Sequence, residues 1–165
     1  MRHPLSFARR TASIPLVLLA LSAAGCLKGT DIGTPSDPAT ETFAPSLGVN
    51  VSQMTKISND LYIQDVVTGT GAQAATGKTL SVTYTGWLKD GTKFDTNVGA
   101  STPYTFPLGV QAVISGWDQG LLGMHAGGTR MLVIGSQLAY GSTGSPPVIP
   151  SNATLVFVVK LLTVQ

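Results

Sequence analysis

The residue types that most often carry enzyme chemistry are scarce in this sequence. It has one cysteine, Cys26, and two histidines, His3 and His125. Neither histidine stands in a nucleophile motif, so no Ser-His-Asp set can be composed, and no cluster has the spacing of metal ligands. A lone His125 before Ala126-Gly127-Gly128 is typical of a surface turn. The sequence therefore predicts no metal, no cofactor and no covalent catalysis.

Aromatic side chains are the more informative group. They make up only 7% of the sequence, yet several of them stand near glycines and turns between positions 84 and 157. Each one alone is explained by an ordinary hydrophobic core, and it is their sequence contexts that favour more than a core. The aromatic residues concerned are Tyr84, Phe94, Tyr104, Phe106, Trp117, Tyr140 and Phe157.

Several motifs around these aromatics resemble the FKBP-type peptidyl-prolyl cis-trans isomerases. The stretch Val82–Asp95 (VTYTGWLKDGTKFD) is similar to the opening signature of that family. Their order and spacing agree with the family over roughly residues 58–164. The further matches are Leu108-Gly109 and Val113–Trp117 with the pocket floor, Leu138–Gly144 and Ile149-Pro150 with the mobile loop, and Ala153–Phe157 with the last strand.

The resemblance implies a substrate pocket between a sheet and a short helix. It makes Trp117 the floor, and it makes Tyr140 and the Ile114 backbone N–H donors to carbonyls of a bound peptide. Asp95 is the polar wall residue, which either orients the twisting carbonyl or only accepts hydrogen bonds from the pocket. The implied catalytic residues are Asp95, Tyr140, Tyr84 and Phe94, and the implied substrate-binding residues are Tyr104, Val113, Ile114, Trp117, Val148, Ile149 and Phe157.

Such a pocket needs no nucleophile to isomerise a proline bond. Rotation about a peptide bond crosses a barrier of about 18–20 kcal/mol because resonance is lost, and the two X-Pro isomers are close in energy. A twisted amide is less dipolar than a planar one, so a dry aromatic pocket favours the twisted state. This is selective binding of the transition state.

Two positions depart from the family pattern. Many members have an arginine a few residues after Asp95 that pairs with it, whereas alignment on Pro103-Tyr104 places Ala100 there. Asp95 would then need other donors, such as tyrosine hydroxyls. Ser145 stands where histidine is common in the loop. These differences bear on catalytic rate and macrolide affinity more than on the fold.

The hydrophobic pattern predicts an α+β domain over residues 57–165. Alternation predicts strands through Leu80–Tyr84 and Tyr104–Leu108, and Thr92–Asp95 returns after a Lys89-Asp90-Gly91 turn. Further strands are expected at Thr129–Ile134 and Ala153–Val164, and one glycine-interrupted helix at Val113–Met124. Many strands and one helix indicate an antiparallel sheet packed on a helix, and the resemblance implies that the sheet half wraps it.

The first 25 residues are typical of a secretory signal peptide. Arginines precede the uncharged stretch Thr11–Gly25, which is too short for a confident membrane span. Leu21–Cys26 resembles the lipobox of bacterial lipoproteins, which predicts a lipidated Cys26 and anchoring by more than one acyl chain. Ordinary cleavage after Ala24 with a free Cys26 thiol is the alternative. Leu27 after the cysteine favours, by analogy, the outer membrane, facing the periplasm.

Residues 26–56 are expected to be the lipidated cysteine and a flexible linker, because Leu27–Lys56 is rich in Pro, Gly, Ser and Thr without periodicity. The formal charge of +2 includes Arg2, Arg9 and Arg10. Cleavage would leave seven basic and eight acidic side chains. The mature chain has no basic run, which excludes an electrostatic basis for nucleic-acid binding.

Two functional hypotheses follow. The first is an isomerase that accelerates folding of proline-containing envelope proteins, acting as a lipid-anchored monomer that could also take macrolide inhibitors. The second is a chaperone or interaction module that binds proline peptides with little turnover. A third hypothesis, a surface lipoprotein that contacts a host, has no direct support in the sequence.

Overall fold

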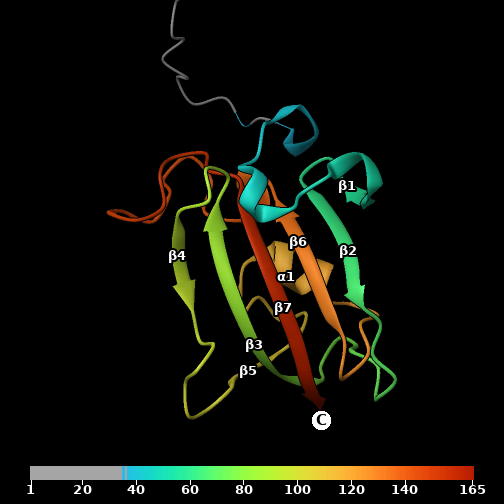
Figure 1. Cartoon of the computed structure of the whole chain (residues 1–165). Coiled ribbons are helices and arrows are strands. Elements are labelled where there is room, and N and C mark those ends of the chain that lie inside the picture. The colour runs from blue at the N-terminus through green and yellow to red at the C-terminus, as the bar shows by residue number, and fades with distance from the viewer. Residues whose placement is uncertain (1–34, 36) are drawn as a thin grey trace, which may run out of the picture. The chain divides into compact units, whose positions relative to one another are not determined.

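The computed structural model describes residue 35 and residues 37–165. In this part of the chain, seven strands form one antiparallel sheet in the order β1-β2-β6-β7-β3-β4, with β5 paired to β3 (Figure 1). The strands are β1 (Thr55–Ser58), β2 (Leu61–Val67), β3 (Thr79–Leu88), β4 (Lys93–Thr96), β5 (Tyr104–Pro107), β6 (Thr129–Ile134) and β7 (Leu155–Val164).

Strands β3 and β7 are paired within the sheet, and β3 alternates apolar and polar side chains whereas β7 is mostly apolar. Leu80 and Val82 of β3 are fully buried, whereas Ser81 and Thr83, which alternate with them, are half-buried. A strand turns successive side chains to opposite faces, so one face of the sheet becomes the core. The predicted α+β class, an antiparallel sheet with one short helix, is confirmed.

The helix α1 spans Ser115–Gly120 and packs on the inner face of this sheet, behind the strands in Figure 1. It is shorter than the predicted stretch 113–124. Leu121 caps its end, and Gly123 follows with φ +74°, a left-handed conformation that ends a helix and that glycine adopts without strain. Trp117 and Leu121 from this turn enter the core beside Leu132 and Leu155.

Strands β1 and β2 were not predicted from the pattern, and burial explains why. Leu61 and Tyr62 are consecutive in β2 and both buried, one in the core under α1 and the other in a second cluster on the opposite face. Val66 and Val67 at the end of the strand are exposed. A strand covered on both faces at one end and open at the other shows no alternation.

Residues 37–54 are folded, in contrast to the flexible linker expected up to residue 56. They contain three short 3-10 helices, η1 (Pro38–Thr40), η2 (Pro45–Leu47) and η3 (Val51–Gln53), and we call this segment the strap. Its apolar side chains cover the outer face of the sheet, where Met54 joins the buried Tyr62, Val133 and Val156, with Phe43, Leu47, Val49 and Val51 around them. The apolar residues are dispersed among Pro and Ser in the sequence. They show no hydrophobic periodicity from which this packing could be predicted.

Polar contacts also hold the strap to the sheet. The Glu41 carboxylate lies 3.2 Å from Lys89 Nζ and accepts a 2.9 Å hydrogen bond from the Thr154 hydroxyl. The Ala44 N–H donates to the Lys89 carbonyl at 2.8 Å. The strap is thereby joined to the β3–β4 turn and to the start of β7.

The predicted signal peptide, Cys26 and the first part of the expected linker lie outside the described residues. Among the residues that are described, no helix has the length and hydropathy needed to cross a membrane.

Candidate functional site

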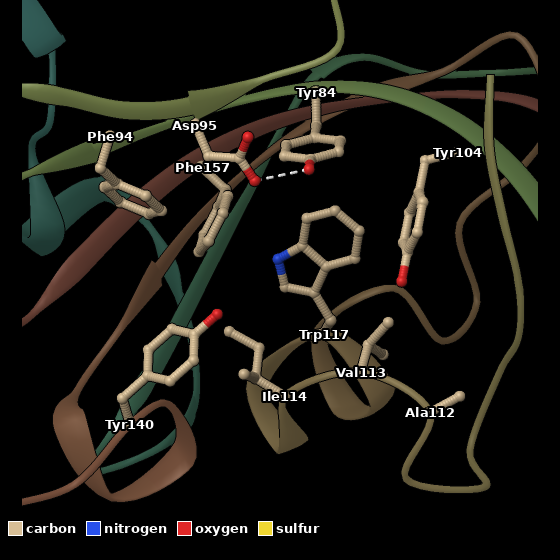
Figure 2. Close-up of a pocket in the computed structure, with 10 residues that line it drawn as sticks. All are labelled: Tyr84, Phe94, Asp95, Tyr104, Ala112, Val113, Ile114, Trp117, Tyr140 and Phe157. Carbon is tan, nitrogen blue, oxygen red and sulfur yellow. Dashed lines mark hydrogen bonds between the residues drawn. The ribbon is translucent and has the colours of Figure 1, made fainter. Parts of the chain in front are cut away.

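A cavity of about 460 Å³ opens between α1 and the inner face of the sheet (Figure 2). This volume lies within the range of small-ligand pockets. Most of its lining side chains are aromatic or aliphatic. The lining residues are Tyr84, Phe94, Asp95, Tyr104, Ala112, Val113, Ile114, Trp117, Tyr140 and Phe157.

Trp117 forms the floor of the cavity. Its indole is 4% exposed and meets Tyr84 edge-on at 5.0 Å and Phe157 edge-on at 5.3 Å between ring centroids. Phe106 supports it from beneath the surface at 5.6 Å. Edge-to-face contacts of this kind are favourable beyond the area they bury. The buried Trp117 Nε1 donor has no hydrogen-bond partner among the described residues.

Gly86 makes room for the aromatic wall. It lies opposite Asp95 of β4 and Phe157 of β7 in the sheet register. A Cβ at this position would lie 2.7 Å from the Phe94 ring and 2.8 Å from the Phe157 ring, which is closer than real Cβ contacts. The glycine that follows Tyr84 and Thr85 in the sequence is thus required for the two rings to meet over the strand.

The polar wall consists of Tyr84 and Asp95. The Tyr84 hydroxyl donates to Asp95 Oδ2 at 2.6 Å, the length of a charge-assisted hydrogen bond. Burial of the phenol, followed by this bond and the Asp95 charge, raises the pKa of Tyr84 well above its usual range. The expectation that a tyrosine replaces the missing arginine as the partner of Asp95 agrees with this geometry.

Tyr140 stands on the opposite side of the mouth, after η4 (Ser136–Leu138), with its hydroxyl directed at the cavity in Figure 2. Burial raises the pKa of Tyr140, and the charges of Asp95 and Tyr104 raise it further, so the hydroxyl stays protonated and can donate. Ile114 precedes α1, and its carbonyl receives the N–H groups of Trp117 and Asp118. These bonds fix the peptide plane between Ile114 and Ser115, which follows directly after the Ile114 N–H that was expected to donate to a ligand.

Two positioning residues were missed in the sequence. The buried Asp118 carboxylate accepts the N–H groups of Gly109 (2.7 Å) and Gln111 (2.8 Å), both of which have positive φ. It therefore holds the loop that leads to Val113. Asn97 bonds the Tyr84 N–H (2.7 Å) and the Val82 carbonyl, which ties the end of β4 to β3. An acid inside an apolar helix and an asparagine at a strand end were the available signals.

The structure brings together nine of the eleven predicted pocket residues and adds Ala112. Val148 and Ile149 are not among the lining residues, so their assignment to substrate binding stays a prediction. Ser145 and Ile149 exchange backbone hydrogen bonds, and this turn directs Ile149 into the hydrophobic core while Val148 remains 48% exposed.

Comparison with known proteins agrees with this architecture. Residues 71–162 match the family model described as FKBP-type peptidyl-prolyl cis-trans isomerase. A Neisseria meningitidis serogroup A protein named FK506-binding protein is 50% identical over 104 residues, which cover 63% of this chain and 95% of that protein. Human peptidyl-prolyl cis-trans isomerase FKBP2 is 54% identical over 89 residues, covering 54% of this chain and 63% of that one.

Solved structures agree as well. The crystal structure of FkpA from Escherichia coli matches with a TM-score of 0.62 and 41% identity, over 68% of this chain and 51% of that chain. The extent of the family match and the identity to a relative spanned almost completely lead to one conclusion: this chain belongs to the FKBP-type peptidyl-prolyl cis-trans isomerase family.

Proposed function

We propose that this protein is a peptidyl-prolyl cis-trans isomerase that acts on flexible, proline-containing polypeptides. The observation that carries the proposal is the cavity itself, a buried indole floor enclosed by aromatic rings with hydroxyl and backbone donors at its rim. A proline ring fits an apolar aromatic floor, and the preceding amide then lies at the polar rim.

The mechanism follows from the loss of dipole on twisting. Planar amides are stabilised by resonance, and the twisted amide has lost it. A pocket floored by Trp117 and walled by Phe94 and Phe157 solvates the planar amide poorly, so it penalises the ground state more than the twisted state. No covalent bond forms or breaks in this reaction.

The donors at the rim hold one side of the bond while the other turns. Tyr140 carries a protonated hydroxyl at the mouth, and the Ile114 N–H lies just before the helix. Our proposal is that these two groups bind the peptide carbonyls that flank the proline. Asp95 is engaged by Tyr84, so its role toward substrate is to orient rather than to transfer a proton.

A proline-isomerisation assay tests the proposal. We expect the purified protein to accelerate cis-to-trans conversion of a short X-Pro peptide, and Tyr140→Phe to reduce kcat/KM by about tenfold, the equivalent of about 1.4 kcal/mol. Asp95→Ala and Trp117→Ala are assayed beside it. A wild-type rate no greater than the uncatalysed rate, with peptide binding retained, would identify a binding module or chaperone with little turnover instead.

We further propose that the protein is a lipid-anchored component of a bacterial cell envelope, where it serves folding of envelope proteins. The lipobox-like Leu21–Cys26 after an apolar segment supports this. A radiolabelled fatty acid should be incorporated into the wild type and not into Cys26→Ala. Absence of label from the wild type would reject the anchor without affecting the isomerase.

The pocket is also proposed to bind FK506-like macrolides, since relatives bear the name FK506-binding protein. The same assay tests this, because a bound macrolide would occupy the Trp117 floor and inhibit isomerisation. If activity is unchanged at a macrolide concentration that saturates a relative, the proposal is rejected.

A further inference from the structure

The formal charge on the cavity lining is of one sign, which is negative. Among its ten lining residues, Asp95 is the one that carries a formal charge, and no lysine, arginine or histidine is present. The ion pairs found within the described residues are Lys56–Asp37, Lys89–Glu41 and Arg130–Asp65, so Asp95 takes part in none. Lys93, two residues earlier in β4, is not paired with it.

The hydrogen bond that Asp95 does make leaves its charge in place. Tyr84 is a neutral donor and occupies Oδ2, so a full negative charge remains at the pocket wall. Asp95 is itself exposed on β4. Its field also reaches across the mouth, because after burial the Asp95 charge is the largest cause that keeps Tyr140 protonated.

Aromatic faces add to this negative potential. Tyr104 and Tyr140 line the cavity while remaining 41% and 40% exposed, so both rings are accessible to a bound chain. The face of an aromatic ring attracts a cation within about 6 Å of its centroid. A carboxylate and two accessible rings, with no competing cation in the lining, form an environment that suits an ammonium or guanidinium group.

We propose that the pocket prefers proline sites with a lysine or arginine next to the proline, and that Asp95 is the residue that determines this preference. The inference rests on the proposed isomerase function and names its substrate class. A proline seated on Trp117 brings its flanking side chain to the rim, where the carboxylate and the tyrosines lie. A glutamate at that position would meet the same charge unfavourably.

The test compares short peptides that differ only in the residue beside the proline: lysine, methionine as an uncharged chain of similar length, and glutamate. Each residue is placed before and, in a second set, after the proline. At low salt we expect kcat/KM for the lysine peptide to exceed that for the methionine peptide by about threefold to fivefold in one set, the range of an exposed ion pair. Glutamate should fall below methionine, and about 1 M salt should shrink the ratio.

Two isosteric variants test whether Asp95 is the source of the lysine preference. Asp95→Asn should bring the lysine-to-methionine ratio close to one. Asp90→Asn removes the same charge from the β3–β4 turn, outside the cavity lining, and keeps the oxygen that accepts the Thr92 N–H, so it should leave the ratio unchanged. If Asp95→Asn is too slow to assay, calorimetric affinities for the same peptides supply the ratio.

The outcomes separate this inference from the function on which it rests. No acceleration with any peptide rejects the isomerase and the inference together. Acceleration with equal rates for lysine and methionine in both sets rejects the charge preference alone. A ratio that survives in Asp95→Asn, or that also collapses in Asp90→Asn, shows that Asp95 is not its source.

Discussion

The two faces of the central sheet are covered in different ways. On the outer face, the strap buries Tyr62, Val133 and Val156, and the carboxylate of Glu41 is engaged by both Lys89 and Thr154. On the inner face, α1 leaves a cavity in which Trp117 Nε1 has no partner among the described residues and Tyr140 is part-exposed. Both faces are largely apolar, but the inner one has a cavity with the Tyr140 hydroxyl at its mouth.

The difference separates stability from function. Polar groups that are satisfied within the protein stabilise the fold and have nothing left to offer a ligand. Groups left open at the rim of a preformed cavity cost some stability and can bind substrate. The outer face should therefore affect folding without affecting catalysis per folded molecule, and the inner face should affect both.

The largest effect on stability and catalysis is expected from replacement of Trp117, the floor of the cavity on the inner face. Trp117→Ala should lower the free energy of unfolding by about 3–5 kcal/mol, as for other large-to-small aromatic changes, and reduce isomerisation of the folded fraction to near the uncatalysed rate. Denaturant titration and the peptide assay measure the two effects. Retention of catalysis within twofold would contradict the role of the indole.

The matching change on the outer face is Met54→Ala, which opens the cluster under the strap. Since Met54 is buried, we expect a loss of about 2–5 kcal/mol in the free energy of unfolding. The value of kcat/KM, corrected for the folded fraction, should stay at the wild-type level. A fall in corrected kcat/KM as large as that of Tyr140→Phe would show that the two faces are not separable.

The polar contact of the strap allows a finer test. Glu41→Ala leaves Thr154 and Lys89 without their acceptor and should cost about 1–3 kcal/mol of unfolding free energy. Glu41→Gln keeps an acceptor for the Thr154 hydroxyl and should recover part of that loss. Equal stability of the two variants would show that charge alone, and not the hydrogen bond, holds the strap.

The smallest effect is expected from alkaline pH. The pKa of Tyr84 is raised in the folded protein, mainly by burial and then by Asp95, whereas an unfolded tyrosine ionises near pH 10. Its contribution is therefore fully present below about pH 10 and is lost as pH rises from there through the folded pKa. Urea midpoints at about pH 9 and pH 11 should fall less in Tyr84→Phe than in wild type, and equal falls would exclude this linkage.

Local patterns were sufficient for much of the inner face. The period-two run in β3 and the run in β7 predicted the two strands, and the family resemblance assigned Tyr84 and Phe157 to one pocket, where the structure brings them together. Family motifs located Trp117 and Tyr140. The predicted helix was too long because its end depends on the positive φ of Gly123. A propensity pattern does not reveal this conformation.

The outer face could not be foreseen in the same way. Phe43, Leu47 and Met54 lie in a segment rich in Pro, Gly, Ser and Thr, whose composition suggests a linker. Their burial depends on β2 and also on the distant strands β6 and β7, and the contact of Glu41 with Thr154 spans 113 residues. Long-range packing of this kind leaves no local period.

The sequence by itself determined the fold class, the family resemblance and most of the aromatic pocket, because strand alternation and closely spaced motifs are local properties. Only the tertiary structure decided the rest. It packed the strap on the sheet, turned Ile149 into the core, and paired Asp95 with the neutral Tyr84 in place of a cation. Each of these outcomes depends on which distant groups compete for the same space or hydrogen bond, and that competition exists only once the chain has folded.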